Sequence, residues 1–214
     1  MMIKWAVGVV FTLTCASVIP RCEGAPTPVY QWSAVETFAA GRWAFHRYPV
    51  PLLPTSPGQS WTMNLFLKAD EIPTETTIVG GFGDTLDSTG TQRYIIFYHG
   101  AVGFWSSNTD CLTDATIERK KWEMVTVTYD GATISVYKNA KLVKSAPIVL
   151  KEAEPVVNLG TEGPWGQPSL YRGRIAKFAI WSACLQAPEI DDLYQSQPAD
   201  NPPAPRRAPK KKTK

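Results

Sequence analysis

The sequence predicts an all-β fold, a two-sheet antiparallel sandwich or jelly roll. From residue 60 onward, short segments alternate apolar and polar positions with period two, which is typical of strands. Gly- and Asp-containing turns separate these segments, and a helical period is nearly absent. The 214 residues include 44% hydrophobic residues and eight each of Trp, Tyr and Phe, enough for one domain with a substantial core.

Most of the chain from residue 60 to 197 has a strand pattern, and we expect the sandwich domain there. In the first strand, Trp61 and Met63 share one face. The segment 122–129 carries large apolar residues on both faces, which predicts a central strand with Trp122 and Tyr129 buried. The expected strands are 61–67, 76–82, 93–98, 102–105, 122–129, 133–137, 142–143, 156–159 and 174–181.

Residues 25–59 are interpreted as an N-terminal extension. Ser33 and Glu36 have the spacing of a capping box, and Gly41 stands where a C-terminal cap would, so the pattern predicts a short helix over 33–40. Four prolines in 49–58 predict an irregular connection.

Residues 1–24 have the pattern of a signal peptide. Lys4 supplies a positive charge, residues 5–19 form an uncharged apolar run, and small residues allow cleavage after Gly24. Fifteen apolar residues fall short of the ~20 that span a bilayer comfortably. We therefore expect a secreted or lumenal protein, with a retained membrane anchor as the alternative.

The basic character of the chain is concentrated at its C-terminus. Residues 25–204 hold 14 Lys and Arg against 18 Asp and Glu, a formal charge of −4, so the sequence pI of 8.6 does not make the domain a nucleic-acid binder. Residues 198–214 are rich in Pro, Lys and Arg and are expected to be disordered. This tail is either a solubilising end or a segment that binds anionic surfaces through Arg206, Arg207, Lys210, Lys211, Lys212 and Lys214.

Cleavage of the signal would leave two cysteines, Cys111 and Cys184. In an oxidising compartment they could form a disulfide, and the alternative is two separate buried thiols. The sequence has no CxxC motif or Cys/His cluster, which argues against a structural zinc site.

Three stretches resemble landmarks of the laminin-G-like jelly-roll domains of the concanavalin A-like lectin/glucanase superfamily. They are SWTMNLFLK at 60–68, WEMVTVTYDG at 122–131 followed by VYKN at 136–139, and Leu159-Gly160 with GRIAKFAIW at 173–181, Leu185 and Glu189-Ile190. The resemblance covers roughly 60–194 and implies a two-sheet sandwich whose closing strand is followed by a short helix. It also implies relatives that bind sugars, proteins or calcium. Ala140 stands where the family usually has Gly, which we expect to alter the type of that turn but not the fold.

The sequence favours binding over catalysis. Glycoside hydrolases of the superfamily carry Glu-x-Asp-x-x-Glu on a strand, but here the segment beginning at Glu189 ends in Tyr194 and follows Pro188, which suits the first turn of a helix. Neither His46 nor His99 lies beside a nucleophile motif. We expect no enzyme, with a glycan-cleaving enzyme as the last alternative.

Two tryptophans are candidate ligand contacts. Trp105 and Trp165 lie near predicted loops, where they either stack on a sugar ring or simply fill the core. Five polar residues in predicted loops either form turns or converge on a calcium ion, which would be the cofactor: Asp84, Asp87, Asn108, Asp110 and Asp114. The predicted function is a lectin-like module that recognises a glycan or a partner protein. The alternative is an accessory structural subunit of a membrane-associated complex.

Overall fold

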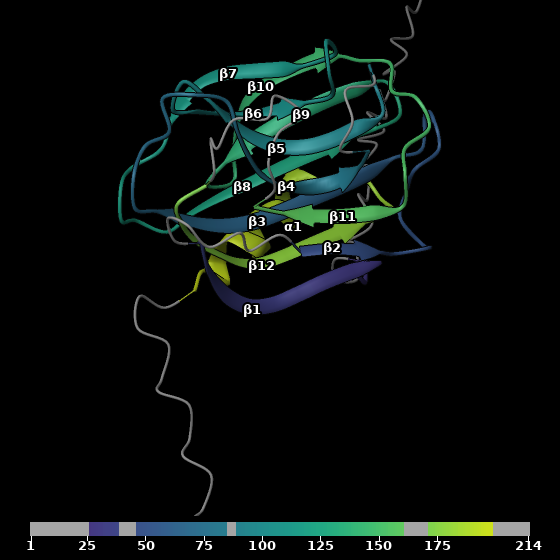
Figure 1. Ribbon diagram of the computed structural model, residues 1–214. Helices are drawn as coiled ribbons and strands as arrows, with labels where there is room; N and C mark the ends of the chain where they lie inside the picture. Colours follow the sequence, from purple (N-terminus) through teal and green to yellow (C-terminus); the bar gives the residue numbers. More distant parts are fainter. Residues whose placement is uncertain (1–25, 39–45, 85–88, 161–170, 199–214) are drawn as a thin grey trace, which may run out of the picture.

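The computed structural model describes residues 26–38, 46–84, 89–160 and 171–198, which form two antiparallel sheets packed face to face (Figure 1). The first, here the β3 sheet, has the order β1 (Tyr30–Phe38), β12 (Gly173–Trp181), β3 (Trp61–Ala69), β8 (Glu123–Tyr129), β9 (Thr133–Lys138) and β10 (Lys141–Pro147). The second, here the β5 sheet, has the order β2 (His46–Pro49), β11 (Val156–Leu159), β4 (Thr77–Gly83), β5 (Gln92–Tyr98), β6 (Ala101–Trp105) and β7 (Cys111–Thr116). The predicted all-β sandwich is confirmed.

Alternation along the strands places the core between the two sheets. Trp61, fully buried, contacts three other rings at centroid distances of 5.7–5.8 Å: Phe82 and Phe104 of the β5 sheet and Tyr129 beside it on β8. Met63 follows Trp61 on the same face of β3, as the period-two pattern predicted.

The strand β8 is central, as predicted, with β3 on one side and β9 on the other. Val125 and Val127 face the β5 sheet, whereas Met124 and the preceding Trp122 belong to a second apolar cluster under the helix α1 (Ala187–Gln195). Burial on both faces explains why this segment carries large apolar residues on both of its faces.

Residues 33–38 form a strand, so the prediction of a helix over 33–40 is wrong. They belong to β1, which pairs with β12 from Tyr30 opposite Ile180 to Phe38 opposite Gly173. The Tyr30 ring also meets the Phe178 ring edge-on at 5.9 Å. Backbone pairing and aromatic packing across 150 residues of sequence outweigh the local capping signal. The sandwich therefore begins at β1 and not at residue 60; residues 39–45 lie outside the described part.

The irregular connection predicted over residues 49–58 is confirmed from residue 50 onward, since Pro49 ends β2 and residues 50–60 contain no helix or strand. A buried cation ties this connection to the core. Arg93 donates hydrogen bonds to the carbonyl oxygens of Thr55 (3.2 Å), Thr91 (3.3 Å) and Lys151 (2.7 Å), and its guanidinium lies 5.5 Å from the Phe82 ring centroid. Burial lowers the pKa of Arg93 to about 10, which leaves it charged at neutral pH. Three backbone carbonyls thus accept hydrogen bonds from the two Nη groups of Arg93, and the bond to Thr55 holds the connection in place.

The expectation that Ala140 alters the type of the β9–β10 turn is wrong. Asn139 and Ala140 have φ of 50° and 62°, and positive φ at both central residues is the pattern of a type I′ hairpin turn. The Asn139 side chain accepts a hydrogen bond from the Met124 backbone N–H at 2.8 Å. This anchor and the hairpin pairing keep the conformation that Gly would favour, so Ala is tolerated with backbone strain.

Replacing Ala140 with Gly should therefore stabilise the protein by about 0.5–1 kcal/mol, because a non-Gly residue at positive φ costs about 1–2 kcal/mol and Gly loses more entropy on folding. Urea denaturation measures the change. Ala132, in the preceding turn, does not have positive φ, so Ala132→Gly is the matched control and should destabilise. A loss of stability in Ala140→Gly would contradict the assigned strain.

The segment 189–194 lies on α1, which confirms the predicted helix start at Pro188. The Gln186 N–H donates a 2.7 Å hydrogen bond to Glu189 Oε2, and Pro188 occupies the first turn. These carboxylates are therefore not arranged along a strand, as the hydrolase motif of the superfamily requires. Among the described residues, no helix is long and apolar enough to cross a membrane.

Cys111 and Cys184 are free thiols in the structure and do not form the disulfide considered from the sequence. Cys111 is buried in the core between the sheets, whereas Cys184 is half-buried on the segment after β12. Burial raises the pKa of both thiols, which disfavours their reactive thiolate forms. The predicted signal peptide (residues 1–24) and, except for Pro198, the predicted tail (residues 198–214) lie outside the described part.

Candidate functional site

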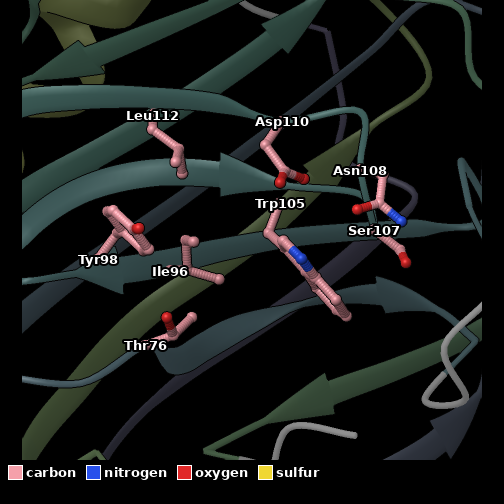
Figure 2. A pocket seen from close by; sticks show the side chains of 8 residues that line it. All are labelled: Thr76, Ile96, Tyr98, Trp105, Ser107, Asn108, Asp110 and Leu112. Carbon is pink, nitrogen blue, oxygen red and sulfur yellow. The ribbon is translucent and has the colours of Figure 1, made fainter. Parts of the chain in front are cut away.

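The β5 sheet carries a hollow of about 260 Å³ on the face turned away from the core. We call it the Trp105 pocket. Figure 2 shows its side chains, which come from strands β5, β6 and β7, from the turn between the last two, and from the residue before β4. The described lining residues are Thr76, Ile96, Tyr98, Trp105, Ser107, Asn108, Asp110 and Leu112.

The strand register explains why this face is hollow. Gly103 on β6 lies opposite Ile96 on β5 and opposite Leu112 on β7, so one row across three strands has no side chain at its centre. Ala101, two residues earlier on the same face, is opposite Tyr98 and is also small. The small residues on β6 therefore leave room on this face, and the larger side chains on either side of them line the pocket.

Trp105 forms a wall and not a protruding platform. It is only 6% exposed, and its ring stacks on the buried Tyr94 ring at 6.0 Å between centroids and 23° between planes. The Tyr94 hydroxyl lies 3.1 Å from the carbonyl oxygens of Gly83 and Asp84 and accepts a 2.8 Å hydrogen bond from Asn158 Nδ2. This network fixes Tyr94, which in turn fixes the Trp105 ring.

Tyr98 is the exposed aromatic residue of the pocket. It is 39% exposed, and the neighbouring His99 ring lies edge-on to it at 4.3 Å. His99 Nδ1 donates to the Thr74 carbonyl oxygen at 2.9 Å, which joins the β5–β6 turn to the segment before β4. Tyr98 thus presents a supported aromatic ring to solvent at the rim.

The polar rim comes from the turn between β6 and β7. Ser107 and Asn108 have φ of 46° and 64°, and the turn is closed by a 2.8 Å hydrogen bond from the Ser106 N–H to Asp110 Oδ1. Partial burial of its carboxyl raises the pKa of Asp110, while the backbone N–H groups of Ser106 and Thr109 act in the opposite direction. The turn therefore places amide, hydroxyl and carboxylate groups beside Trp105.

The structure brings together some of the sequence-predicted site residues. Trp105, Asn108 and Asp110 line one pocket. Asp84 and Asp114 are not among its described lining residues, and Asp87 and Trp165 lie outside the described part. Within the residues described, no group of three or more His, Cys, Asp or Glu side chains could hold a metal ion, so the calcium site stays a prediction.

Sequence reasoning missed the other lining residues. The alternation of Ile96 and Tyr98 with core residues on β5 was a detectable signal, because period two places both on the face away from the core. Strand β7 was not predicted at all, since its sequence CLTDAT alternates weakly, and Leu112 was therefore overlooked.

The family assignment agrees with this architecture. A family model described as the concanavalin A-like lectin/glucanases superfamily, of the laminin-G type, matches residues 47–191. The chain belongs to this superfamily, and the predicted resemblance is confirmed.

Solved structures of the same fold include glycan-binding modules and parts of enzymes. The chain is 13% identical to the CBM40 module of a Ruminococcus gnavus IT-sialidase bound to α2,3-sialyllactose, with a TM-score of 0.61 and coverage of 78% of this chain and 99% of the module. It is 17% identical to domain 4 of an extracellular GH43 arabinanase from Geobacillus stearothermophilus in complex with arabinotriose (TM-score 0.53; coverage 76% and 87%).

A mutant Trypanosoma rangeli sialidase also matches, at 18% identity and a TM-score of 0.53, over 65% of this chain but only 23% of the sialidase. At these identities the likeness concerns the fold alone. A comparison with curated protein sequences yields no match.

Proposed function

We propose that this protein is a non-enzymatic, lectin-like module that binds a glycan in the Trp105 pocket, in a secreted or lumenal setting. The observation that supports this most directly is that an exposed aromatic residue, Tyr98, and a turn rich in hydrogen-bonding groups line the same hollow. The setting rests on the export pattern of residues 1–24.

The chemistry of the lining suits a sugar ring. The C–H face of a pyranose packs on aromatic surface, and Tyr98 and the exposed edge of Trp105 supply it. Thr76, Ser107 and Asn108 carry donors and acceptors that suit sugar hydroxyls. The volume is near the lower end of the ~300–1,000 Å³ typical of small-ligand pockets, so one sugar unit of a longer glycan is the fitting occupant.

The lining does not favour glycoside hydrolysis. Hydrolases need two carboxyl groups flanking the scissile bond, and Asp110 is the only carboxylate among the described lining residues. The two fold relatives bound to sialyllactose and arabinotriose support glycan recognition by this architecture.

The first test is to probe the purified protein on an array of neutral and acidic glycans. The second is to measure the affinity of the glycan that binds best for the wild type, for Tyr98→Ala and for Leu142→Ala. Tyr98→Ala should weaken binding about tenfold, because it removes the exposed aromatic ring on which the sugar is proposed to pack. Leu142 is an exposed apolar residue on β10 of the other sheet, and its replacement should have no effect.

A protein that binds no glycan on the array and co-purifies with membrane partners would overturn the proposal in favour of a structural subunit. Equal losses in Tyr98→Ala and Leu142→Ala would show that any glycan site lies elsewhere. Release of shortened glycan by the wild-type protein would contradict the non-enzymatic part of the proposal.

A further inference from the structure

We infer that the Trp105 pocket takes neutral glycans and discriminates against acidic ones. The inference rests on the proposed function and names the class of ligand at the same site. It comes from the charge of the side chains that line the pocket, because recognition of an acidic sugar requires positively charged or N–H donor groups.

The described lining residues include one charged side chain, Asp110, and no Lys or Arg. Recognition of a carboxylate or sulfate relies on charge-assisted hydrogen bonds from Arg or Lys, or on a cluster of backbone N–H groups. Here the Ser106 N–H of the turn already donates to Asp110 itself, and the Thr109 N–H also interacts with this carboxylate. The negative charge of an acidic sugar would therefore be repelled by the Asp110 carboxylate.

Two lysines that contact β7 have partners outside the pocket lining or on the backbone. Lys144 reaches across from β10 to the carbonyl oxygen of Leu112 at 2.6 Å, and Lys138 donates to the carbonyl oxygen of Thr116 at 2.5 Å and lies 3.1 Å from Glu123. Both lysines thus close the side of the sandwich between β7 and the other sheet. His99 at the rim has its Nδ1 engaged with Thr74.

Asp110 cannot easily turn away from a ligand. Its Oδ1 closes the strained turn that contains Ser107 and Asn108, both at positive φ, so rotation of the carboxylate would leave the Ser106 N–H unsatisfied. Two like charges held about 4 Å apart in a water-like dielectric weaken binding about fivefold, and more where water is partly excluded. The fixed carboxylate is thus the group expected to carry the discrimination.

The test uses matched pairs of glycans on the full chain: sialylated or uronic-acid oligosaccharides as free acids, and the same oligosaccharides with the carboxyl converted to the methyl ester. The ester forms should bind about fivefold more tightly than the acids at low salt. The ratio should shrink toward one at 1 M salt, where the screening length falls to about 3 Å.

Asp110→Asn isolates the responsible residue, because the amide oxygen can still accept from the Ser106 N–H while the charge is lost. The ratio of ester to acid affinity should fall to about twofold or less in Asp110→Asn. Asp191 lies on α1, which packs against the β3 sheet and not against the sheet that carries the pocket. Asp191→Asn removes the same charge there and should keep the wild-type ratio of ester to acid affinity. The salt series on the wild-type protein tests the inference even if Asp110→Asn folds poorly.

The outcomes separate the two proposals. Tighter binding of the free acids would overturn the inference and leave glycan binding intact, as would an unchanged ratio in a folded Asp110→Asn protein. Failure of every neutral and acidic glycan to bind would overturn the proposed function, and the inference with it.

Discussion

Replacing Trp122 with Ala should lower the free energy of unfolding by about 3–5 kcal/mol, the usual cost of truncating a buried aromatic residue. Trp122 is 4% exposed and packs in the cluster that joins the outer face of the β3 sheet to α1. Phe66 and Met124 line this cluster from the sheet, and Ile190 lines it from the helix. The Trp122 carbonyl oxygen also accepts a 2.9 Å hydrogen bond from Gln197 Nε2 just beyond the helix. Loss of the indole should therefore loosen the docking of α1.

Urea denaturation followed by circular dichroism measures this loss. Trp122→Phe is the matched control and should cost less than about 1.5 kcal/mol, because it keeps most of the volume. It also removes the indole N–H, which is buried without a hydrogen-bond partner among the described residues. An unchanged midpoint in Trp122→Ala would show that the helix does not depend on this cluster.

Replacing Gly81 with Ala should destabilise the protein by at least about 3 kcal/mol or prevent folding, at the upper end of overpacking effects. An added Cβ would lie 2.0 Å from the Arg93 carbonyl oxygen and 2.8 Å from the Tyr94 Cα, both in the backbone of the paired strand β5. Backbone atoms cannot rotate aside as a flexible side chain can. The two strands would have to separate, and this would disturb Arg93 and Tyr94, which hold the connection over residues 50–60 and the Trp105 ring.

Gly103→Ala is the control for this prediction. Gly103 lies in the same sheet on β6, and an added Cβ would meet its nearest neighbours, the Leu112 Cδ2 and the Cys111 carbonyl oxygen, at 3.4 Å. A small local adjustment accommodates such contacts, so the change in the free energy of unfolding should stay below about 1 kcal/mol. Similar stabilities of the two variants would contradict the close approach of β4 and β5 at Gly81.

Much of the fold could be predicted from the sequence because the strands between residues 61 and 181 carry local, period-two signals. The segment 122–129 illustrates this: apolar residues on both faces predicted a central strand, and β8 indeed has β3 and β9 beside it. Strand β11 has the predicted bounds, 156–159. Pro188 and Glu189 likewise marked the start of α1 through local helix-capping chemistry.

Predictions based on local chemistry alone failed where a distant partner determines the backbone. The Ser33 and Glu36 spacing favoured a helix, yet pairing with β12 makes the segment a strand. Ala140 lacks the conformational freedom of Gly, yet the hairpin holds it at positive φ.

The sequence by itself determined that this chain is a β-sandwich, because alternation and turn chemistry are local properties of the chain. The superfamily followed from the resemblance of three stretches to known motifs and from the match of the family model. The tertiary structure decided where the Trp105 pocket lies. Ile96, Gly103 and Leu112 are aligned across three strands, which leaves room on the face that carries the pocket, and no sequence spacing encodes that register. The fold also brings Asp110 into the same pocket as Trp105 and Tyr98, and this carboxylate is the basis of the proposed discrimination against acidic glycans.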